Sequence, residues 1–454
     1  MEKVIAVFDI GKTNKKFFLF NAALTICHEV QTELPLTEDE DGHPCESVQQ
    51  LTNWVKTTIA KALEQKDFTI EALNFSAYGA SFVHIDAAGN PVTPLYNYTK
   101  PFPKTLRQKF YAQYGPESHF SANTGSFDSG MLNSGMQLFW LKHHHPKRFE
   151  NVKRSLHLPQ YLSYLFSQQT VSDYTSIGCH TALWDYQKKR YHPWVKKEGL
   201  TSVLAPIVQT NTATMQCIQG KNLMVGVGVH DSSAALIPYL KSVSEPFMLL
   251  STGTWNVALN PFASKPLTKK ETAQGGLYYM QIDGTPVKAA RLFLGYEYEH
   301  QVKQLNQQFG VSSDYHKSMP FSSSIYQKLT KGPAPQFHWV GLSGGNKKTM
   351  PLSYTTFEEA YHHLMMALVA WQVESLRLAQ GKTPIKQLFV EGGFSNNEIF
   401  LKLLCLLLPT MEIYSSHLAQ GSALGAALLM RTKALPTPFL TSENQLTKQK
   451  VPAL

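Results

Sequence analysis

The sequence predicts an α/β protein of two related domains, with residues 1–240 in the first domain and residues 241–454 in the second. Short apolar runs alternate with helix-like periodicity along most of the chain. A strand, a polar glycine turn and a second strand occur once in each half. With 454 residues, 43% of them hydrophobic, the chain is long enough to bury two cores. Two such domains are expected to enclose a cleft.

The first half begins with a hairpin-like pair of strands, at residues 4–10 and 15–20. A helix over residues 48–64 and a strand over residues 72–76 follow. The pattern of residues 135–166 is helical, and a later strand ends at Gly228 before a helix that begins near His230. We expect this last junction to approach the interface between the domains.

The second half repeats this order, with strands at residues 247–250 and 256–259 around a polar turn. The apolar run of residues 399–409 has only eleven residues and contains Lys402, so it predicts a buried helix and no membrane span. A strand is expected at residues 411–414, and the polar tail beyond Arg431 is expected to be peripheral.

Composition excludes several classes of protein. The net charge is +9, but the basic residues are dispersed and no recognition motif accompanies them, so no nucleic-acid partner is predicted. The N-terminus lacks the features of a secretory signal, which makes the cytoplasm the expected compartment, with no membrane partner. Five widely spaced cysteines predict reduced thiols.

A turn rich in polar groups follows the first strand. Asp9 closes the strand, where its carboxylate could hold Mg²⁺ through water. The next residues offer amides, a hydroxyl and ammonium groups that suit a phosphate tail: Gly11, Lys12, Thr13, Asn14 and Lys15. The alternative is an ordinary hairpin turn.

A second hydroxyl-rich turn contains Thr252, Gly253 and Thr254. One such turn is weak support for a function. Two in corresponding positions favour a phosphate clamp that acts from both sides, because phosphoryl transfer depends mainly on positioning and electrostatics.

Asp231 follows His230 at the predicted strand-to-helix junction. One interpretation is a helix cap, because Asp is a preferred capping residue. The other is a general base that accepts the proton of a substrate hydroxyl. Both roles can hold at once.

A Gly-Gly turn near the C-terminus predicts a nucleotide contact. Small residues let a planar ligand approach the backbone, so Gly392, Gly393 and Asn396 or Asn397 are candidates to border the adenine and ribose. Residues 421–427 are interpreted as a close-packed helix. The run His143–His145 predicts a solvated helix end and no metal site, because adjacent histidines on a helix point in different directions.

Together these motifs resemble the FGGY carbohydrate kinases over nearly the whole chain and in that family's order. Within the family, the segments Ser76–Asp86, His230–Pro238 and Gly253–Trp255 look like the rhamnulokinase and fuculokinase branch. This resemblance favours a 6-deoxy-ketohexose substrate such as L-rhamnulose or L-fuculose.

The resemblance implies an actin-like, ribonuclease-H-like domain in each half, with the sugar bound mostly by the first domain and ATP by the second. It implies a kinase in which Asp231 matches the catalytic base and Asp9 the metal-associated acid. Residues 12–15 and 252–254 match the two phosphate loops, and Gly392 and Gly393 the adenosine motif. The expected substrate contacts are Tyr78, Gly79, Ser81, His230 and Asp231. A homodimer is compatible with the family.

The sequence departs from the family pattern in the sugar pocket. Ser81 stands where rhamnulokinase-like relatives carry an Asp, and Tyr98–Lys100 stands where many members carry Asp and Arg after an aromatic residue. Lys12 replaces a common hydroxyl residue. Because hydrogen-bonding groups set sugar discrimination, a pentulose such as xylulose or ribulose is an alternative substrate. A catalytically silent, sugar-responsive regulator is a second alternative.

Overall fold

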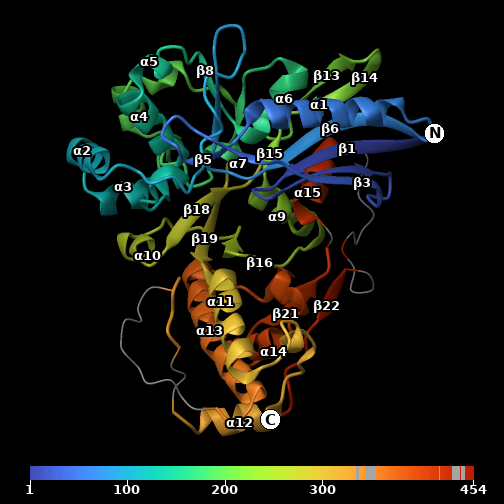
Figure 1. Ribbon diagram of the computed structural model, residues 1–454, viewed down its shortest axis with the longest axis vertical. Coiled ribbons are helices and arrows are strands. Elements are labelled where there is room, and N and C mark those ends of the chain that lie inside the picture. Colours follow the sequence, from blue (N-terminus) through green and yellow to red (C-terminus); the bar gives the residue numbers. More distant parts are fainter. Residues whose placement is uncertain (334–336, 343–353, 419, 432–439, 441–444) are drawn as a thin grey trace.

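The computed structural model describes residues 1–333, 337–342, 354–418, 420–431, 440 and 445–454, which form two bodies, one above the other (Figure 1). A seven-stranded sheet lies in each body. The first sheet consists of β1 (Glu2–Ile10), β2 (Asn14–Phe20), β3 (Ile26–Glu33), β6 (Phe68–Ala77), β13 (Ala213–Ile218), β14 (Lys221–Gly226) and β15 (Val229–His230). The second consists of β16 (Phe247–Thr252), β17 (Asn256–Asn260), β18 (Gly276–Met280), β19 (Pro286–Leu292), β20 (Gln387–Gly392), β21 (Glu412–Ser416) and β22 (Leu446–Lys448).

The two sheets share one topology. The order β3-β2-β1-β6-β14 in the first matches the order β19-β17-β16-β20-β21 in the second. In both, the first three strands are antiparallel neighbours, and the last three are parallel. The predicted pair of related α/β domains is therefore confirmed.

Helices α9 (Asp231–Ser242) and α15 (Gly421–Met430) cross between the halves. Side chains of α9 enter the core of the second sheet, where Leu236 joins Leu249. Side chains of α15 enter a core with the first sheet, where Ala423 joins Val7. At Gly425 of α15 a Cβ atom would lie 2.0 Å from the backbone oxygen of Ala234, so only glycine allows this close approach.

The remaining elements cover the sheets and extend the first half. The longer helices are α1 (Val48–Glu64), α2 (Lys104–Tyr114), α4 (Ser134–His144), α6 (Leu158–Ser167), α11 (Leu294–Phe309), α13 (Phe357–Gln380) and α14 (Glu398–Leu407). The shorter helices are α3 (Glu117–Thr124), α5 (Pro146–Phe149), α7 (Tyr174–Ile177), α8 (Pro193–Lys197), α10 (Lys269–Ala273) and α12 (Ser323–Thr330). Small two-stranded ladders pair β4 (Leu36–Glu38) with β5 (Pro44–Glu46), β7 (Phe82–Ile85) with β8 (Arg154–His157), β9 (Ser172–Asp173) with β12 (Ile207–Val208), and β10 (Trp184–Asp185) with β11 (Arg190–Tyr191).

One expected element is wrong. Residues 135–166 do not form a continuous helical region, because β8 separates α5 from α6 and pairs with β7. Proline at the start of both α5 and α6 marks each new helix. The helix at residues 48–64 and the other expected strands are confirmed, but the strand expected to end at Gly228 ends at Gly226 and the two-residue β15 follows it. In the tail, residues 432–439 and 441–444 lie outside the described residues, while β22 joins the edge of the second sheet.

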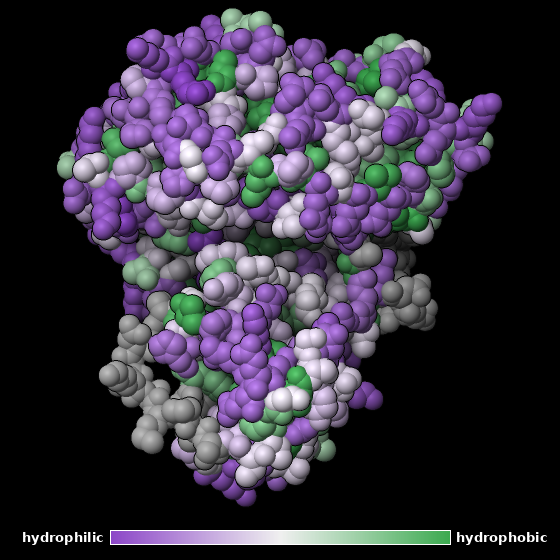
Figure 2. All heavy atoms as spheres, in the orientation of Figure 1, coloured by the Kyte–Doolittle hydropathy of each residue, from purple (hydrophilic) through white to green (hydrophobic). Residues whose placement is uncertain are grey.

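The predicted buried helix at residues 399–409 corresponds to α14, whose Ile399, Phe400 and Leu404 are fully buried. Among the described residues, no helix combines the length and the apolar character that crossing a membrane requires. Figure 2 shows the surface hollowed along the boundary between the two bodies.

Candidate active site

Two cavities lie along this boundary, with volumes of about 510 Å³ and 1040 Å³. Both are lined by Asp128 from the first half and by Trp255, Arg291 and Phe293 from the second. Tyr98 lines the smaller one. The predicted site residues line neither of these two cavities; most of them lie at or just beyond the ends of the central strands of the two sheets.

Asp9 lies near the end of β1, beside Ser76 of β6. Its Oδ2 accepts a hydrogen bond of 2.8 Å from the hydroxyl of Ser422, at the start of α15. Burial raises the pKa of Asp9 to about 6, and the nearby charge of Asp231 adds to the effect. Asp9 and the adjacent hydroxyls of Ser76 and Ser422 are oxygen donors of the kind that Mg²⁺ prefers.

The turn after β1 has a backbone hydrogen bond of 2.9 Å from the Gly11 amide to the Asn14 oxygen. Lys15 is buried, and its ammonium donates to the backbone oxygens of Gly11 and Lys12. Thr13 is exposed. Lys15 therefore braces the turn from inside, and the groups left free at its surface are backbone amides and the Thr13 hydroxyl.

Glu46 of β5 holds both lysines of this turn. Its two carboxylate oxygens lie 3.0 Å from Lys12 Nζ and 3.3 Å from Lys15 Nζ. Lys12 Nζ also lies 5.3 Å from the ring centroids of both Tyr78 and Tyr98. Lys12 thus faces two aromatic rings, and it shares the carboxylate of Glu46 with Lys15.

Asp231 is the first residue of α9, and His230 occupies the N-cap position without capping through its side chain. The Asp231 carboxylate accepts from the Ser232 amide and hydroxyl at 2.5 and 3.2 Å, and its side chain is 35% exposed. Its Oδ1 lies 3.3 Å from His230 Nε2. Because burial lowers the pKa of His230, the imidazole is neutral at pH 7. One face of the carboxylate remains open.

Several of the predicted substrate residues have buried polar atoms that lack hydrogen-bond partners. The hydroxyls of Tyr78 and Ser81 and the Nδ1 atom of His230 have no hydrogen-bond partner. Tyr78 and Ser81 are nevertheless near each other and near Glu46, and burial raises the pKa of Tyr78 well above its ordinary value. Buried polar atoms are normally paired, so these atoms indicate the position of a polar ligand.

Gly79 allows its turn to pack closely against Cys179 and His230. A Cβ atom at this position would lie 2.6 Å from Cys179 Sγ and 2.7 Å from His230 Nε2. Any side chain here would therefore displace His230 from its contact with Asp231.

On the opposite side, Thr252 ends β16 and its hydroxyl accepts a 3.0 Å hydrogen bond from the Phe394 amide and donates to the Glu391 oxygen. Thr252 therefore ties the second predicted phosphate turn to the Gly-Gly turn. Gly253 and Thr254 are exposed beyond it. The backbone oxygen of Thr254 accepts a 3.2 Å hydrogen bond from the Tyr296 amide, and Gly295 packs closely on the backbone oxygen of Gly253.

Gly392 and Gly393 are exposed at the end of β20. Asn396 is exposed in the same turn, whereas Asn397 caps α14, with its Oδ1 accepting from the Phe400 amide at 2.9 Å. The amide group of Asn397 also donates to the Tyr361 hydroxyl at 2.9 Å. Of the two predicted asparagines, Asn396 has the side chain that is open to a ligand.

Glu391 lies beside the Gly-Gly turn, where it accepts a 3.2 Å hydrogen bond from Tyr239. Burial raises its pKa to about 7, against hydrogen bonds that lower it. Between its ordinary pKa of about 4.5 and this raised pKa, Glu391 is protonated in the folded state and ionised in the unfolded chain. The free energy of unfolding therefore falls as the pH rises from about 4.5 to about 7.

We expect Glu391→Gln to be more stable than the natural protein at pH 8 by about 2 kcal/mol, since each unit of pKa shift corresponds to about 1.4 kcal/mol and partial exposure reduces the total. At pH 4.5 the two proteins should unfold at similar denaturant concentrations. Urea unfolding at both pH values measures this difference. An equal gain at both pH values would contradict the assignment of the effect to ionisation.

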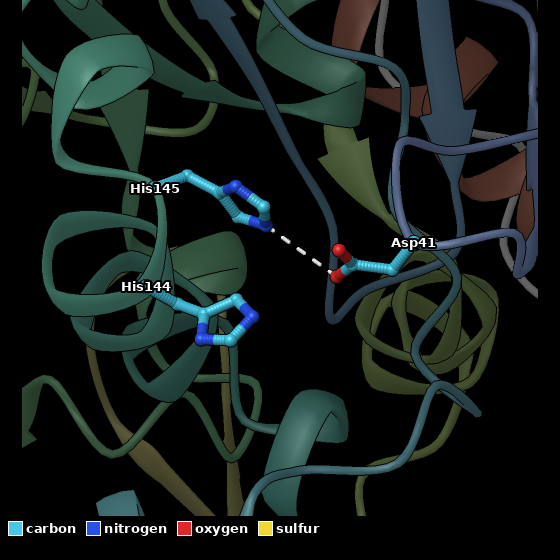
Figure 3. Close-up of side chains that lie close together, drawn as sticks. All are labelled: Asp41, His144 and His145. Carbon is cyan, nitrogen blue, oxygen red and sulfur yellow. Dashed lines mark hydrogen bonds and ion pairs between the residues drawn. The ribbon is translucent and has the colours of Figure 1, made fainter.

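The histidine run lies away from the cleft, at the end of α4. His144 and His145 lie close to Asp41 (Figure 3), with ligand atoms all within 4.8 Å of one another. The expectation that the histidines diverge is wrong here, because His145 has left the helical conformation. The ammonium of Lys100 already lies 2.8 Å from Asp41 Oδ2. This cation disfavours a metal ion at the same carboxylate.

Sequence reasoning missed three contributors to the site: Glu46, Arg291 and Ser422. Glu46 and Ser422 reach the first turn and Asp9 from elements far along the chain, so no local motif contains them. Arg291 had a weak signal, as one of the two basic residues, with Lys288, of an otherwise apolar strand.

The crossing helices, the duplicated topology and the cleft together define a two-domain, actin-like fold. Residues 4–236 match the family model for the N-terminal domain of the FGGY family of carbohydrate kinases, and residues 244–438 match the model for the FGGY C-terminal domain. The chain belongs to the FGGY family of carbohydrate kinases.

Curated relatives include rhamnulokinases. The one from Halalkalibacterium halodurans is 23% identical over 283 residues, which are 60% of this chain and 58% of the relative. The one from Bacteroides thetaiotaomicron is 25% identical over 207 residues, which are 43% of this chain and 42% of the relative. The matched segment thus spans about half the length of these relatives.

Solved structures are similar to this chain over longer spans than the curated relatives are. A carbohydrate kinase from Novosphingobium aromaticivorans has a TM-score of 0.77 at 22% identity, with 98% of this chain and 96% of that chain covered. A xylulose kinase from Lactobacillus acidophilus has a TM-score of 0.75 at 15% identity, with 94% and 89% covered. At these identities the similarity shows the fold.

Proposed function

We propose that this protein transfers the γ-phosphoryl group of ATP to a primary hydroxyl of a small ketose sugar, with Asp231 as the general base. The observation that supports this most is the open carboxylate of Asp231. It begins α9, the helix that crosses from the first half into the core of the second half. This is where an acceptor hydroxyl and a phosphate chain would have to meet.

The roles of the residues follow from their contacts. Asp231 accepts the proton of the acceptor hydroxyl as the oxygen attacks phosphorus. His230, which is neutral and fixed by burial, orients that carboxylate from 3.3 Å. Tyr78 and Ser81 offer hydroxyls to the sugar, and Gly79 lets His230 pack close to the same turn.

The family assigns ATP and Mg²⁺ to this cleft, and the residues fit both groups. Asp9 would hold Mg²⁺ through water, and the ion would neutralise charge on the phosphates. Backbone amides of residues 11–14 and 253–254 would face the phosphate oxygens, and Gly392, Gly393 and Asn396 would border the adenosine.

The acceptor that the relatives favour is a 6-deoxy-ketohexose, since curated relatives are named rhamnulokinases. By its resemblance to the family, this chain is expected to depart from the usual pattern at Ser81 and at Tyr98–Lys100. Lys100 is buried, and its ammonium group forms ion pairs with Asp39 and Asp41. Its charge therefore does not reach the sugar. A pentulose is the second candidate, because this pocket has a changed set of hydrogen-bonding groups.

We expect ADP release in a coupled assay with Mg-ATP when L-rhamnulose, L-fuculose, D- and L-xylulose, D- and L-ribulose and glycerol are offered in turn. One ketose should be turned over at least about 100-fold more efficiently than glycerol, because a site built to bind several hydroxyls rejects an acceptor that lacks them. Tight binding of a ketose without turnover of any acceptor would replace the kinase with the silent, sugar-responsive regulator.

A further inference from the structure

One buried carboxylate contacts both ammonium groups of the turn after β1. Glu46 Oε1 lies 3.0 Å from Lys12 Nζ, and Glu46 Oε2 lies 3.3 Å from Lys15 Nζ. The side chains of Glu46 and Lys15 are only 5% and 2% exposed. Among the described residues, no other acid forms an ion pair with either lysine. Glu46 is therefore the anion that compensates the buried charge of Lys15.

Lys15 transmits this contact to the backbone of the turn. Its Nζ donates hydrogen bonds to the backbone oxygens of Gly11 at 3.1 Å and of Lys12 at 2.9 Å. Burial lowers the pKa of Lys15, and the charge of Glu46 opposes this shift. The position of the turn thus depends on Lys15, and the charged state of Lys15 depends on Glu46.

The contacts of Lys15 also set the direction of two backbone amides. A peptide group is planar and trans, so its N–H points opposite to its C=O. Because the oxygens of Gly11 and Lys12 point to Lys15, the amides of Lys12 and Thr13 point away from it. In the part of the chain that the structure describes, neither amide donates a hydrogen bond. Two adjacent free amides of a turn are suited to bind a phosphate oxygen.

Glu46 itself is anchored outside this turn. Its amide donates to the Leu95 oxygen at 3.3 Å, and the Leu95 amide donates to the Glu46 oxygen at 3.2 Å. The next residue, Ser47, is the N-cap of α1. The backbone of Glu46 is thus held on both sides, so the carboxylate provides a fixed point to which the turn is tied.

The charges of this cluster allow an effect of position to be distinguished from an effect of charge. Two ammonium groups face one carboxylate, so the cluster carries a net positive charge beside the turn. Glu46→Gln removes the negative charge, and the net charge does not fall even if Lys15 then loses its proton. Charge alone would therefore leave the affinity for a phosphate group unchanged or raise it. A lower affinity would indicate that the amides have moved.

We propose that Glu46 is a positioning residue of the nucleotide site, which acts through Lys15 to direct the amides of Lys12 and Thr13 toward the phosphate chain of ATP. The inference rests on the proposed kinase function. Glu46 itself does not touch the nucleotide, and it has no role at the Gly-Gly turn of the second half, where the adenosine would lie. Binding of a nucleotide with phosphates should thus depend on Glu46, whereas binding of adenosine should not.

The test measures binding of adenosine and of the β,γ-imido analogue of ATP with Mg²⁺ by calorimetry, without an acceptor. In Glu46→Gln the affinity for the imido analogue should fall about 10- to 100-fold, as is typical of residues that orient the ligands of metal sites. The affinity for adenosine should be unchanged. Lys15→Met should show the same selective loss, because it removes the donor to both turn oxygens. In the double variant the two losses should not add, since both residues act in one chain of contacts.

Asp39→Asn is the matched control. Asp39 lies between β4 and β5, its side chain is 1% exposed, and its Oδ2 lies 2.6 Å from the ammonium of Lys100. This variant breaks a comparable buried ion pair near Glu46 in sequence but does not involve the turn, so the affinity for the imido analogue should be unchanged. Lys15→Met provides the answer if Glu46→Gln fails to fold, which thermal unfolding would show.

Three results would overturn the inference: Glu46→Gln binds the imido analogue as tightly as the natural protein or more tightly, it loses affinity for the analogue and for adenosine alike, or Asp39→Asn causes the same loss. If the imido analogue binds in the way that depends on Glu46 but no acceptor is phosphorylated, the positioning role stands and the kinase proposal fails. If the natural protein binds neither the analogue nor adenosine, both proposals fail.

Discussion

Replacing Asp231 with asparagine is expected to lower kcat by about 10²- to 10⁴-fold with the best acceptor, the usual contribution of a positioned general base. Asparagine retains the shape and can still accept from the Ser232 amide, which lies 2.5 Å from the natural carboxylate. It cannot take up the proton of the acceptor hydroxyl. KM for ATP should change little, because the substitution leaves both phosphate turns intact. Steady-state kinetics with saturating Mg-ATP measures the loss.

The control for this variant is stability. Asp231 lies in the first turn of α9, where loss of its charge costs about 0.3–1 kcal/mol through the helix dipole. Ser232→Ala removes the neighbouring hydroxyl contact of 3.2 Å and leaves the carboxylate in place, so it should retain most of the turnover. If Asp231→Asn has full activity, the base must be another group, and the open carboxylate would need a different role.

The duplicated order of strand, polar turn and strand could be predicted from sequence because each unit is local. Hydrophobic runs mark β1 and β16, and the glycine turns interrupt them. The same locality explains the error over residues 135–166. The strand β8 is only four residues long and is stabilised by pairing with β7, far away in sequence. No periodicity signals such a partner.

The acids of the site could be predicted, but their surroundings could not. Ser422 donates to Asp9 across 413 residues of sequence, and this contact exists because α15 of the second half packs on the first sheet. Glu46 comes from a short hairpin strand with no motif of its own. Tertiary contacts of this kind decide which turn groups are free and which are already paired.

The crossing of α9 and α15 has a consequence for catalysis. Asp231 begins α9, and Ser422 in the first turn of α15 holds Asp9, so both acids depend on the packing of these two helices. At Gly425 the helices meet with backbone against backbone. If one half rotates relative to the other, the axis of rotation would therefore pass close to the reacting groups. The rotation would then change the positions of Asp231 and Asp9 little.

Gly392→Ala is expected to destabilise the second domain by about 3 kcal/mol and to raise KM for ATP at least about 10-fold. Gly392 has φ of +81°, where a side chain is strained by about 1–2 kcal/mol. A Cβ atom would also lie 1.9 Å from the backbone oxygen of Thr252. Because β20 pairs with β16 at this point, the turn cannot move away without breaking the ladder, and overpacking of this kind adds about 1–3 kcal/mol.

The adjacent Gly393 provides the matched control. A Cβ atom there would have no neighbour within 4 Å, and its φ is not in the left-handed region. Gly393→Ala should therefore unfold at the same urea concentration as the natural protein. A rise in its KM for ATP would then report contact with the nucleotide, free of any effect on folding. If Gly392→Ala is as stable as Gly393→Ala, the close approach of β16 to the Gly-Gly turn does not hold in solution, and the position proposed for the adenosine falls with it.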